Sequence, residues 1–158
     1  MTENKTTCCP KFNPDSLDGK ELDLSDKTFI KEAYNCFFHI PLNIGSVMKK
    51  TCALAEKNNM LAENALWLCD EKNPFKAYLY LETKGEIKEA INEKLEGKYF
   101  VKIFEGSYQM VPKWIKELKN ILDKKGQKAE RFLSFYTTCP KCAKIYGHNY
   151  VGIFAKIK

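Results

Sequence analysis

The stretch that decides the fold is residues 99–126, YFVKIFEGSYQMVPKWIKELKNILDKKG. Its start, Tyr99–Phe104, is aromatic or β-branched at all but one position, which is typical of a strand. After turn residues at 106–108, apolar side chains recur every three or four positions from Met110 to Lys124 and predict an amphipathic helix. Pro112 suits the first helical turn, and Gly126 suits the position just beyond the helix end. The predicted buried face comprises Val111, Trp114, Ile115, Leu118, Ile121 and Leu122.

The same order of elements occurs earlier in the chain. A short β-rich run, Cys36–Leu42, precedes Asn43, which we expect to cap a helix that ends near Asn58. Its apolar face would contain Ile44, Val47, Met48, Cys52 and Ala55. Each predicted helix is followed by two β-like runs joined by turn residues: Leu66–Cys69 with Phe75–Leu81, and Phe132–Tyr136 with Tyr150–Ile157. The fold class predicted is therefore α+β, with duplicated β-α-β-β units forming one antiparallel sheet and two long helices on one face.

At 158 residues the chain fits a single domain with its own core. We expect residues 1–34 to form an N-terminal lead-in with short strands, and residues 35–158 to form the domain. Its two repeats would span about 35–84 and 98–158. The charged connector Gly85–Gly97 leaves room for a short helix around Ile87–Leu95.

The charge pattern argues against several kinds of partner. The net charge of +6 comes from lysines spread along the chain, and Arg131 is the only arginine. Nucleic-acid readers usually cluster their basic residues and use arginine for bidentate contacts, so no nucleic-acid partner is expected. No apolar stretch approaches the ~20 residues that span a bilayer, and residues 1–11 lack the apolar core of a signal peptide. We therefore expect a cytoplasmic protein with no membrane partner, and its oligomeric state stays open.

The seven cysteines fall into two groups. Cys36, Cys52 and Cys69 lie in apolar runs and are expected in the core. The Cys-x-x-Cys pair Cys139 and Cys142 supplies half of a tetrahedral zinc site. A structural zinc would need two more ligands, which Cys8 and Cys9, or one of them with His148, could provide. The alternative is a free or redox-active thiol pair.

Carboxylates and aromatic residues complete the candidate site. Glu71 lies at the first hairpin turn and Glu105 ends the strand before the second helix, so either could act as a catalytic base or bind a cation. The alternative for both is a solvated carboxylate at a turn. The candidate ligand-binding residues are Trp67, Tyr78, Tyr80, Tyr108, Trp114, Phe135 and Tyr136. Because strand residues alternate between two faces, Tyr78 and Tyr80 either line a pocket together or both face away from it.

Two groups of residues suggest a family. The run Phe104–Tyr108, followed by Pro112-Lys113-Trp114, a long helix and Gly126, resembles the second half of the gyrase-inhibitor-like (GyrI-like) small-molecule-binding proteins. Ser107 stands where that family has proline, and Ser134 stands where many of its members carry a ligand-facing glutamate. The runs Cys8–Phe12 and Thr137–Lys144 resemble a bacterial and archaeal branch described as hypothetical or hydrolase-like.

The resemblance implies a duplicated fold with an aromatic cleft that accepts hydrophobic or cationic molecules. Similar proteins act as effector-binding domains, gyrase inhibitors, or hydrolases of cyclopropane-bearing alkylating toxins. With no helix-turn-helix segment ahead of the domain, we expect a stand-alone protein that binds an apolar, cationic or electrophilic compound. The alternative is a hydrolase of reactive xenobiotics that uses a cleft carboxylate. Neither reading requires a cofactor, apart from the structural zinc considered above.

Overall fold

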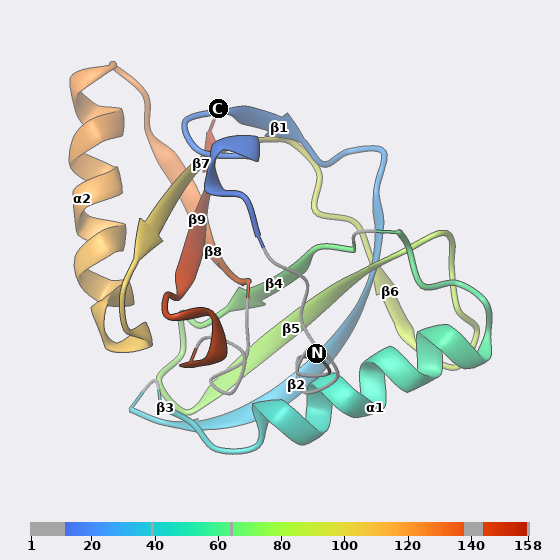
Figure 1. Cartoon of the computed structure of the whole chain (residues 1–158). Coiled ribbons are helices and arrows are strands. Elements are labelled where there is room, and N and C mark those ends of the chain that lie inside the picture. The colour runs from blue at the N-terminus through green and yellow to red at the C-terminus, as the bar shows by residue number, and fades with distance from the viewer. Residues whose placement is uncertain (1–11, 39, 64, 138–143, 158) are drawn as a thin grey trace. The chain divides into compact units, whose positions relative to one another are not determined.

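The computed structural model describes residues 12–38, 40–63, 65–137 and 144–157 (Figure 1). These residues belong to two compact units. Unit 1 is drawn from residues 1–22 and 99–158, and unit 2 from residues 23–98. No helix in the described ranges is long and apolar enough to cross a membrane.

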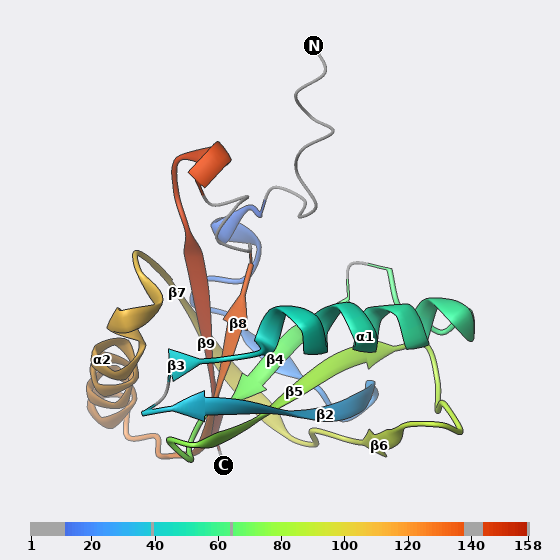
Figure 2. The ribbon, with the colours of Figure 1, turned by 90° about the horizontal axis from the view of Figure 1, so that it is seen from below.

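Unit 2 contains one long helix and antiparallel strands. Its elements are β2 (Thr28–Phe37), β3 (Ile40–Pro41), α1 (Ile44–Lys57), β4 (Trp67–Asp70), β5 (Lys76–Thr83) and β6 (Ile91–Glu93). The strand order is β4-β5-β2-β3. Strand β3 pairs with the C-terminal end of β2, and β6 pairs with its N-terminal part, at Phe29 to Lys31. Helix α1 runs alongside β2 and β5 in both ribbon views (Figures 1 and 2) and contacts both strands.

Two predicted elements of unit 2 differ from the structure. The first strand, β2, starts at Thr28, well before the expected Cys36. The charged residue Lys31 fits within this strand because its side chain forms an ion pair with Glu93 of β6. The short helix around Ile87–Leu95 is absent, and turns and β6 occupy this connector. The side chain of Asn92 accepts from the Ile87 amide and donates to the Ile87 carbonyl, which closes a turn where a helix would need those backbone groups.

Unit 1 is built from the remaining elements. These are η2 (Pro14–Ser16), β1 (Glu21–Asp23), β7 (Lys98–Glu105), η3 (Tyr108–Met110), α2 (Val111–Lys124), β8 (Ala129–Tyr136) and β9 (Tyr150–Ile157). Helix α2 ends as predicted, and Gly126 beyond it has a φ of 74°, which glycine adopts without steric cost. The strand order is β1-β7-β9-β8, with β8 and β9 antiparallel.

The internal duplication predicted from the sequence is confirmed. In unit 2 the strand before the helix, β2, lies next to β5, and β5 lies next to β4. In unit 1 the strand before the helix, β7, lies next to β9, and β9 lies next to β8. Both units therefore follow the order β-α-β-β with the same neighbour relations, and the α+β class is confirmed.

The two long helices pack differently on their strands. Helix α2 buries Val111, Trp114, Leu118 and Leu122, all on the predicted face. Helix α1 buries only Thr51 and Ala55, and its other apolar residues stay half-buried or exposed. The Thr51 hydroxyl donates to the Val47 carbonyl at 2.6 Å, so a polar side chain can occupy this buried position. The α1 face of unit 2 is therefore the less completely packed of the two helical faces.

Candidate functional site

Side chains on the α1 face of the unit 2 sheet lie in rows across β4, β5 and β2. The first row is Trp67, Leu81 and Ile30, and it packs under the C-terminal half of α1 with Ala55. The second row is Cys69, Leu79 and Glu32. The third pairs Ala77 with Tyr34. Because side chains alternate along a strand, all of these residues project from the same face as Trp67.

A tyrosine–carboxylate pair lies at the third row. Tyr34 is 1% exposed, and its hydroxyl donates to Oε2 of Glu71 at 3.2 Å. Strand β5 separates β2 from β4, and its residue in this row is Ala77, which is fully buried. Since a methyl group fills little space, the phenol of Tyr34 can reach past it to the carboxylate that follows β4.

The Glu71 carboxylate acts on two neighbouring thiols. Burial raises the pKa of the Cys69 thiol well above its ordinary value, and the Glu71 carboxylate adds to the shift. Burial and Glu71 likewise raise the pKa of Cys36. Both cysteines therefore stay protonated, which disfavours a role as nucleophile or metal ligand. The negative charge of Glu71 favours a positively charged ligand.

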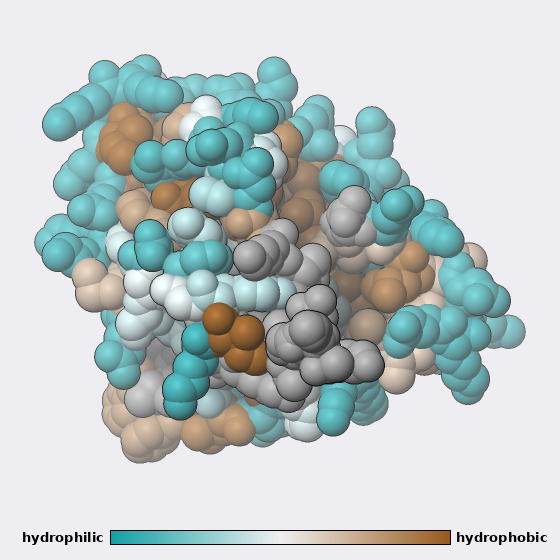
Figure 3. All heavy atoms as spheres, in the orientation of Figure 1, coloured by the Kyte–Doolittle hydropathy of each residue, from teal (hydrophilic) through white to brown (hydrophobic). Residues whose placement is uncertain are grey.

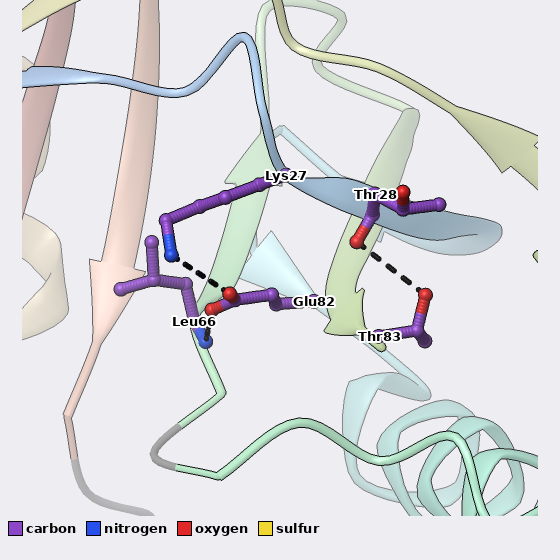
Figure 4. Close-up of polar contacts among 5 residues, drawn as sticks. All are labelled: Lys27, Thr28, Leu66, Glu82 and Thr83. Atoms are coloured by element: carbon purple, nitrogen blue, oxygen red, sulfur yellow. Dashed lines mark hydrogen bonds and ion pairs between the residues drawn. The ribbon is translucent and has the colours of Figure 1, made fainter. Parts of the chain in front are cut away.

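The start of β4, and with it Trp67, is fixed by a half-buried carboxylate. Glu82 accepts from the Leu66 amide at 3.1 Å and from Nζ of Lys27 at 2.8 Å (Figure 4). The next residue, Thr83, donates to the carbonyls of Gly85 and Thr28. These contacts hold the chain ahead of β4 against β5, so the indole of Trp67 projects from a rigid strand.

Tyr78 and Tyr80 project from the opposite face of the sheet to Trp67. Nζ of Lys31 lies 4.3 Å from the ring centroid of Tyr78 and 5.8 Å from that of Tyr80, and it forms an ion pair with Glu93. Burial opposes the charge on Lys31, yet Tyr80 and Glu93 outweigh it, and the pKa of the amine is raised. On this face the two tyrosines hold a cation that belongs to the chain itself, and their proposed role with a ligand stays a prediction.

The candidate aromatics of unit 1 also divide between two faces. Trp114 is 5% exposed and stacks on Phe104, with centroids 5.1 Å apart and planes at 10°. Tyr108 and Tyr136 pack with α2 and meet edge to face at 5.1 Å. Phe135 points the other way, toward Phe12. Ser134 projects from the α2 face, where it is 4% exposed and opposite Ile153.

Glu105 and Tyr108 come together at an open groove of ≈ 490 Å³ in unit 1. The groove is lined by Glu105, Gly106, Ser107, Tyr108, Lys144, Gly147, His148 and Asn149. Two hydrogen bonds join the walls of the groove. The backbone amide of Gly106 donates to the backbone carbonyl of Asn149, and the side-chain amide of Asn149 donates to the carbonyl of Gly106. Glu105 is exposed at this groove, whereas Glu71 is half-buried on an apolar face.

The proposed metal ligands Cys8, Cys9, Cys139 and Cys142 lie outside the described residues, and the zinc site stays a prediction. Within the described ranges no three His, Cys, Asp or Glu side chains cluster to hold a metal. Tyr34 and Ala77 were not recognised from the sequence. The alternation of residues 28–37 is the signal that could have placed Tyr34 on the face of Trp67.

Solved structures with the same fold share little sequence with this chain. SAV2435 bound to tetraphenylphosphonium is 16% identical, with a TM-score of 0.53, and the match covers 88% of this chain and 93% of that one. An uncharacterised conserved protein from Listeria innocua is 8% identical, with a TM-score of 0.67 and coverage of 90% and 94%. These likenesses show the fold and fit the GyrI-like architecture that the sequence resembles.

Comparison of the sequence with known proteins gives two further results. No functionally curated protein matches the chain. A family model described as "Bacterial hydrolase" matches residues 1–157, nearly the whole length. The chain therefore belongs to the bacterial hydrolase family.

Proposed function

We propose that the protein binds a small, largely apolar cation on the α1 face of unit 2, with Glu71 as the anionic anchor. The observation that carries this proposal is the Tyr34–Glu71 pair, at 3.2 Å, on a face whose rows are apolar apart from Glu32. A carboxylate in such surroundings attracts a cation more strongly than one in bulk water, because the local dielectric is lower. Apolar rows beside it would bury the uncharged parts of the ligand.

Two further observations support a cationic ligand. Burial is the main cause of the raised thiol pKa values of Cys36 and Cys69, and the negative charge of Glu71 adds to both shifts. Trp67 lies two rows away, where an indole can contact aryl groups or a cation. SAV2435, which shares the fold, is bound to tetraphenylphosphonium, an aromatic cation. That compound is therefore a suitable probe.

Calorimetric titration with tetraphenylphosphonium tests the proposal. We expect Glu71→Gln to weaken binding at least about tenfold, since the amide keeps the shape of the side chain and removes its charge. Glu89→Gln is the matched control, because Glu89 is exposed in the same unit, and it should leave the affinity unchanged. Triphenylphosphine oxide, a neutral aryl compound, should bind the native protein weakly. Equal affinity in Glu71→Gln and the native protein would refute the anchor role.

Hydrolysis is the second candidate function, and the bacterial hydrolase family favours it. We propose that in this case Glu71 acts as a general base. It would take a proton from water while the water oxygen attacks an electrophilic carbon, and the bond that breaks would leave its electron pair on the departing atom. That atom would then be protonated from solvent. Glu105, exposed at the unit 1 groove, is the other candidate base.

Incubation with a cyclopropane-bearing alkylating compound, followed by mass spectrometry, separates binding from turnover. A hydrolase should yield hydrated product in molar excess over protein, beyond the rate in buffer. Product that disappears in Glu71→Gln and persists in Glu105→Gln identifies Glu71 as the base, and the reverse pattern identifies Glu105. Product that never exceeds the protein concentration contradicts the hydrolase.

A further inference from the structure

Four exposed hydrophobic side chains gather at one end of unit 2. Phe37, Phe38, Leu42 and Phe75 are 56%, 62%, 65% and 52% exposed, and we call them the aromatic tip. Figure 3 shows hydrophobic atoms reaching the surface near the end of the molecule where Figure 1 places β3. Single exposed apolar residues are ordinary, but here three phenylalanine rings contact one another, and Leu42 follows β3, which pairs with the end of β2 that carries Phe37.

Ring contacts and backbone hydrogen bonds hold the aromatic tip in place. The rings of Phe37 and Phe38 lie 4.7 Å apart, and those of Phe38 and Phe75 lie 5.3 Å apart. Phe38 has a φ of 48°, a left-handed conformation that is costly for a bulky residue. Backbone bonds join the strands here, from the Cys36 amide to Phe75 and from the Leu42 amide to Asn35. The fold therefore holds these rings together in water at a cost, with little burial in return.

The exposed charged side chains next to the aromatic tip are lysines. Residues 37–55 contain Lys49 and Lys50 and no acidic residue. Residues 72–81 contain Lys72 and Lys76, again without an acidic residue. All four lysines are exposed. Asp70 and Glu71, just before Lys72, are half-buried, so the exposed charges that flank the apolar centre of the patch are the four lysines.

We infer that the aromatic tip docks on the surface of an anionic lipid membrane. Phenylalanine and leucine side chains would enter the boundary between headgroups and acyl chains, and the flanking lysines would contact anionic headgroups. This is a peripheral contact, which needs no apolar stretch of spanning length. The sequence-based expectation of no membrane partner considered only spanning segments and a signal peptide, so it did not address this mode.

A second copy of the chain is a poorer fit to the same surface. The four side chains expose on the order of 500 Å². Two such patches facing each other would bury about 1,000 Å², short of the roughly 1,200–2,000 Å² of stable interfaces. The lysines would also be brought toward one another, and their repulsion would oppose association.

Co-sedimentation with lipid vesicles tests the inference on the full chain. We expect binding to vesicles of phosphatidylcholine and phosphatidylglycerol at three to one, and much weaker binding to phosphatidylcholine alone. The double variant Phe37→Ser/Phe38→Ser should partition at least about tenfold less, because two interfacial rings are lost. Lys72→Gln/Lys76→Gln should also partition at least about tenfold less at low salt, at roughly fivefold per lysine.

Matched controls separate this docking from unspecific attraction of a basic protein. Ile91→Ser removes another exposed apolar residue of unit 2, which is 66% exposed, and should leave binding unchanged. Lys88→Gln/Lys94→Gln removes the same charge from exposed positions elsewhere in unit 2 and should have a smaller effect than Lys72→Gln/Lys76→Gln. Equal losses in tip and control variants overturn the inference, as does failure to bind anionic vesicles. So does a fall in oligomeric mass caused by the phenylalanine variant in the absence of lipid.

Discussion

Replacing Trp114 by alanine is expected to lower the free energy of unfolding by about 3–5 kcal/mol, the range for truncating a buried tryptophan. The indole is 5% exposed, belongs to the α2 core and stacks on Phe104. It also closes over the turn before η3: a Cβ at Gly106 would lie 3.0 Å from Cζ2 of Trp114. Truncation would therefore leave a cavity bordered by both a strand and this turn. Urea denaturation followed by circular dichroism measures the change.

Lys113→Ala is the control for Trp114→Ala. Lys113 is the preceding residue on α2, is exposed, and should change the free energy of unfolding by no more than about 0.5 kcal/mol. If Trp114→Ala costs no more than this control, the indole is not a core residue. It would then have to be reconsidered as a ligand-facing side chain, as the sequence had suggested.

The second large effect is expected at alkaline pH. Burial, with help from Glu71, raises the pKa of Cys69 in the folded state above its unfolded value of 9.0. Stability from a group with a raised pKa is fully present below the unfolded pKa and is lost as pH rises toward the folded pKa. Above pH 9 the unfolded thiol loses its proton while the folded one keeps it. The free energy of unfolding should therefore fall by about 1.4 kcal/mol per pH unit on account of Cys69.

Comparison with Cys69→Ala isolates this contribution from lysine and tyrosine titrations. Urea denaturation under reducing conditions between pH 8 and 11 should give a steeper decline for the native protein. Between pH 9 and 11 the free energy of unfolding of the native protein should fall by about 2–3 kcal/mol relative to that of Cys69→Ala. This relative change does not depend on how much stability the substitution itself removes. Parallel curves would show that Cys69 titrates alike in both states, contrary to its burial.

The sequence allowed the helices and both hairpins to be predicted because their signals are local. The face of α2 follows from apolar spacing, and Gly126 marks where that helix stops. The start of β2 could not be predicted in the same way, since Lys31 and Glu32 interrupt its apolar pattern. Lys31 is accommodated by Glu93, which is 62 residues away in sequence, and no local pattern reveals such a partner.

The candidate site shows the same division between local and long-range information. Glu71 could be singled out as a carboxylate beside a β-hairpin. Its partner Tyr34 is 37 residues distant, and the pairing depends on strand order. Alternation predicted that Tyr78 and Tyr80 share a face, but the register with β4 was needed to show that Trp67 projects from the other one.

Ala77 has a consequence for how relatives of this chain could be sorted. The phenol and the carboxylate meet only because the residue on the intervening strand ends at a methyl group. A valine or leucine there would push Tyr34 aside and leave the acid without that donor, even with both polar residues retained. One small position thus decides whether two side chains act as a pair, and it can be read in any homologous sequence before its structure is known.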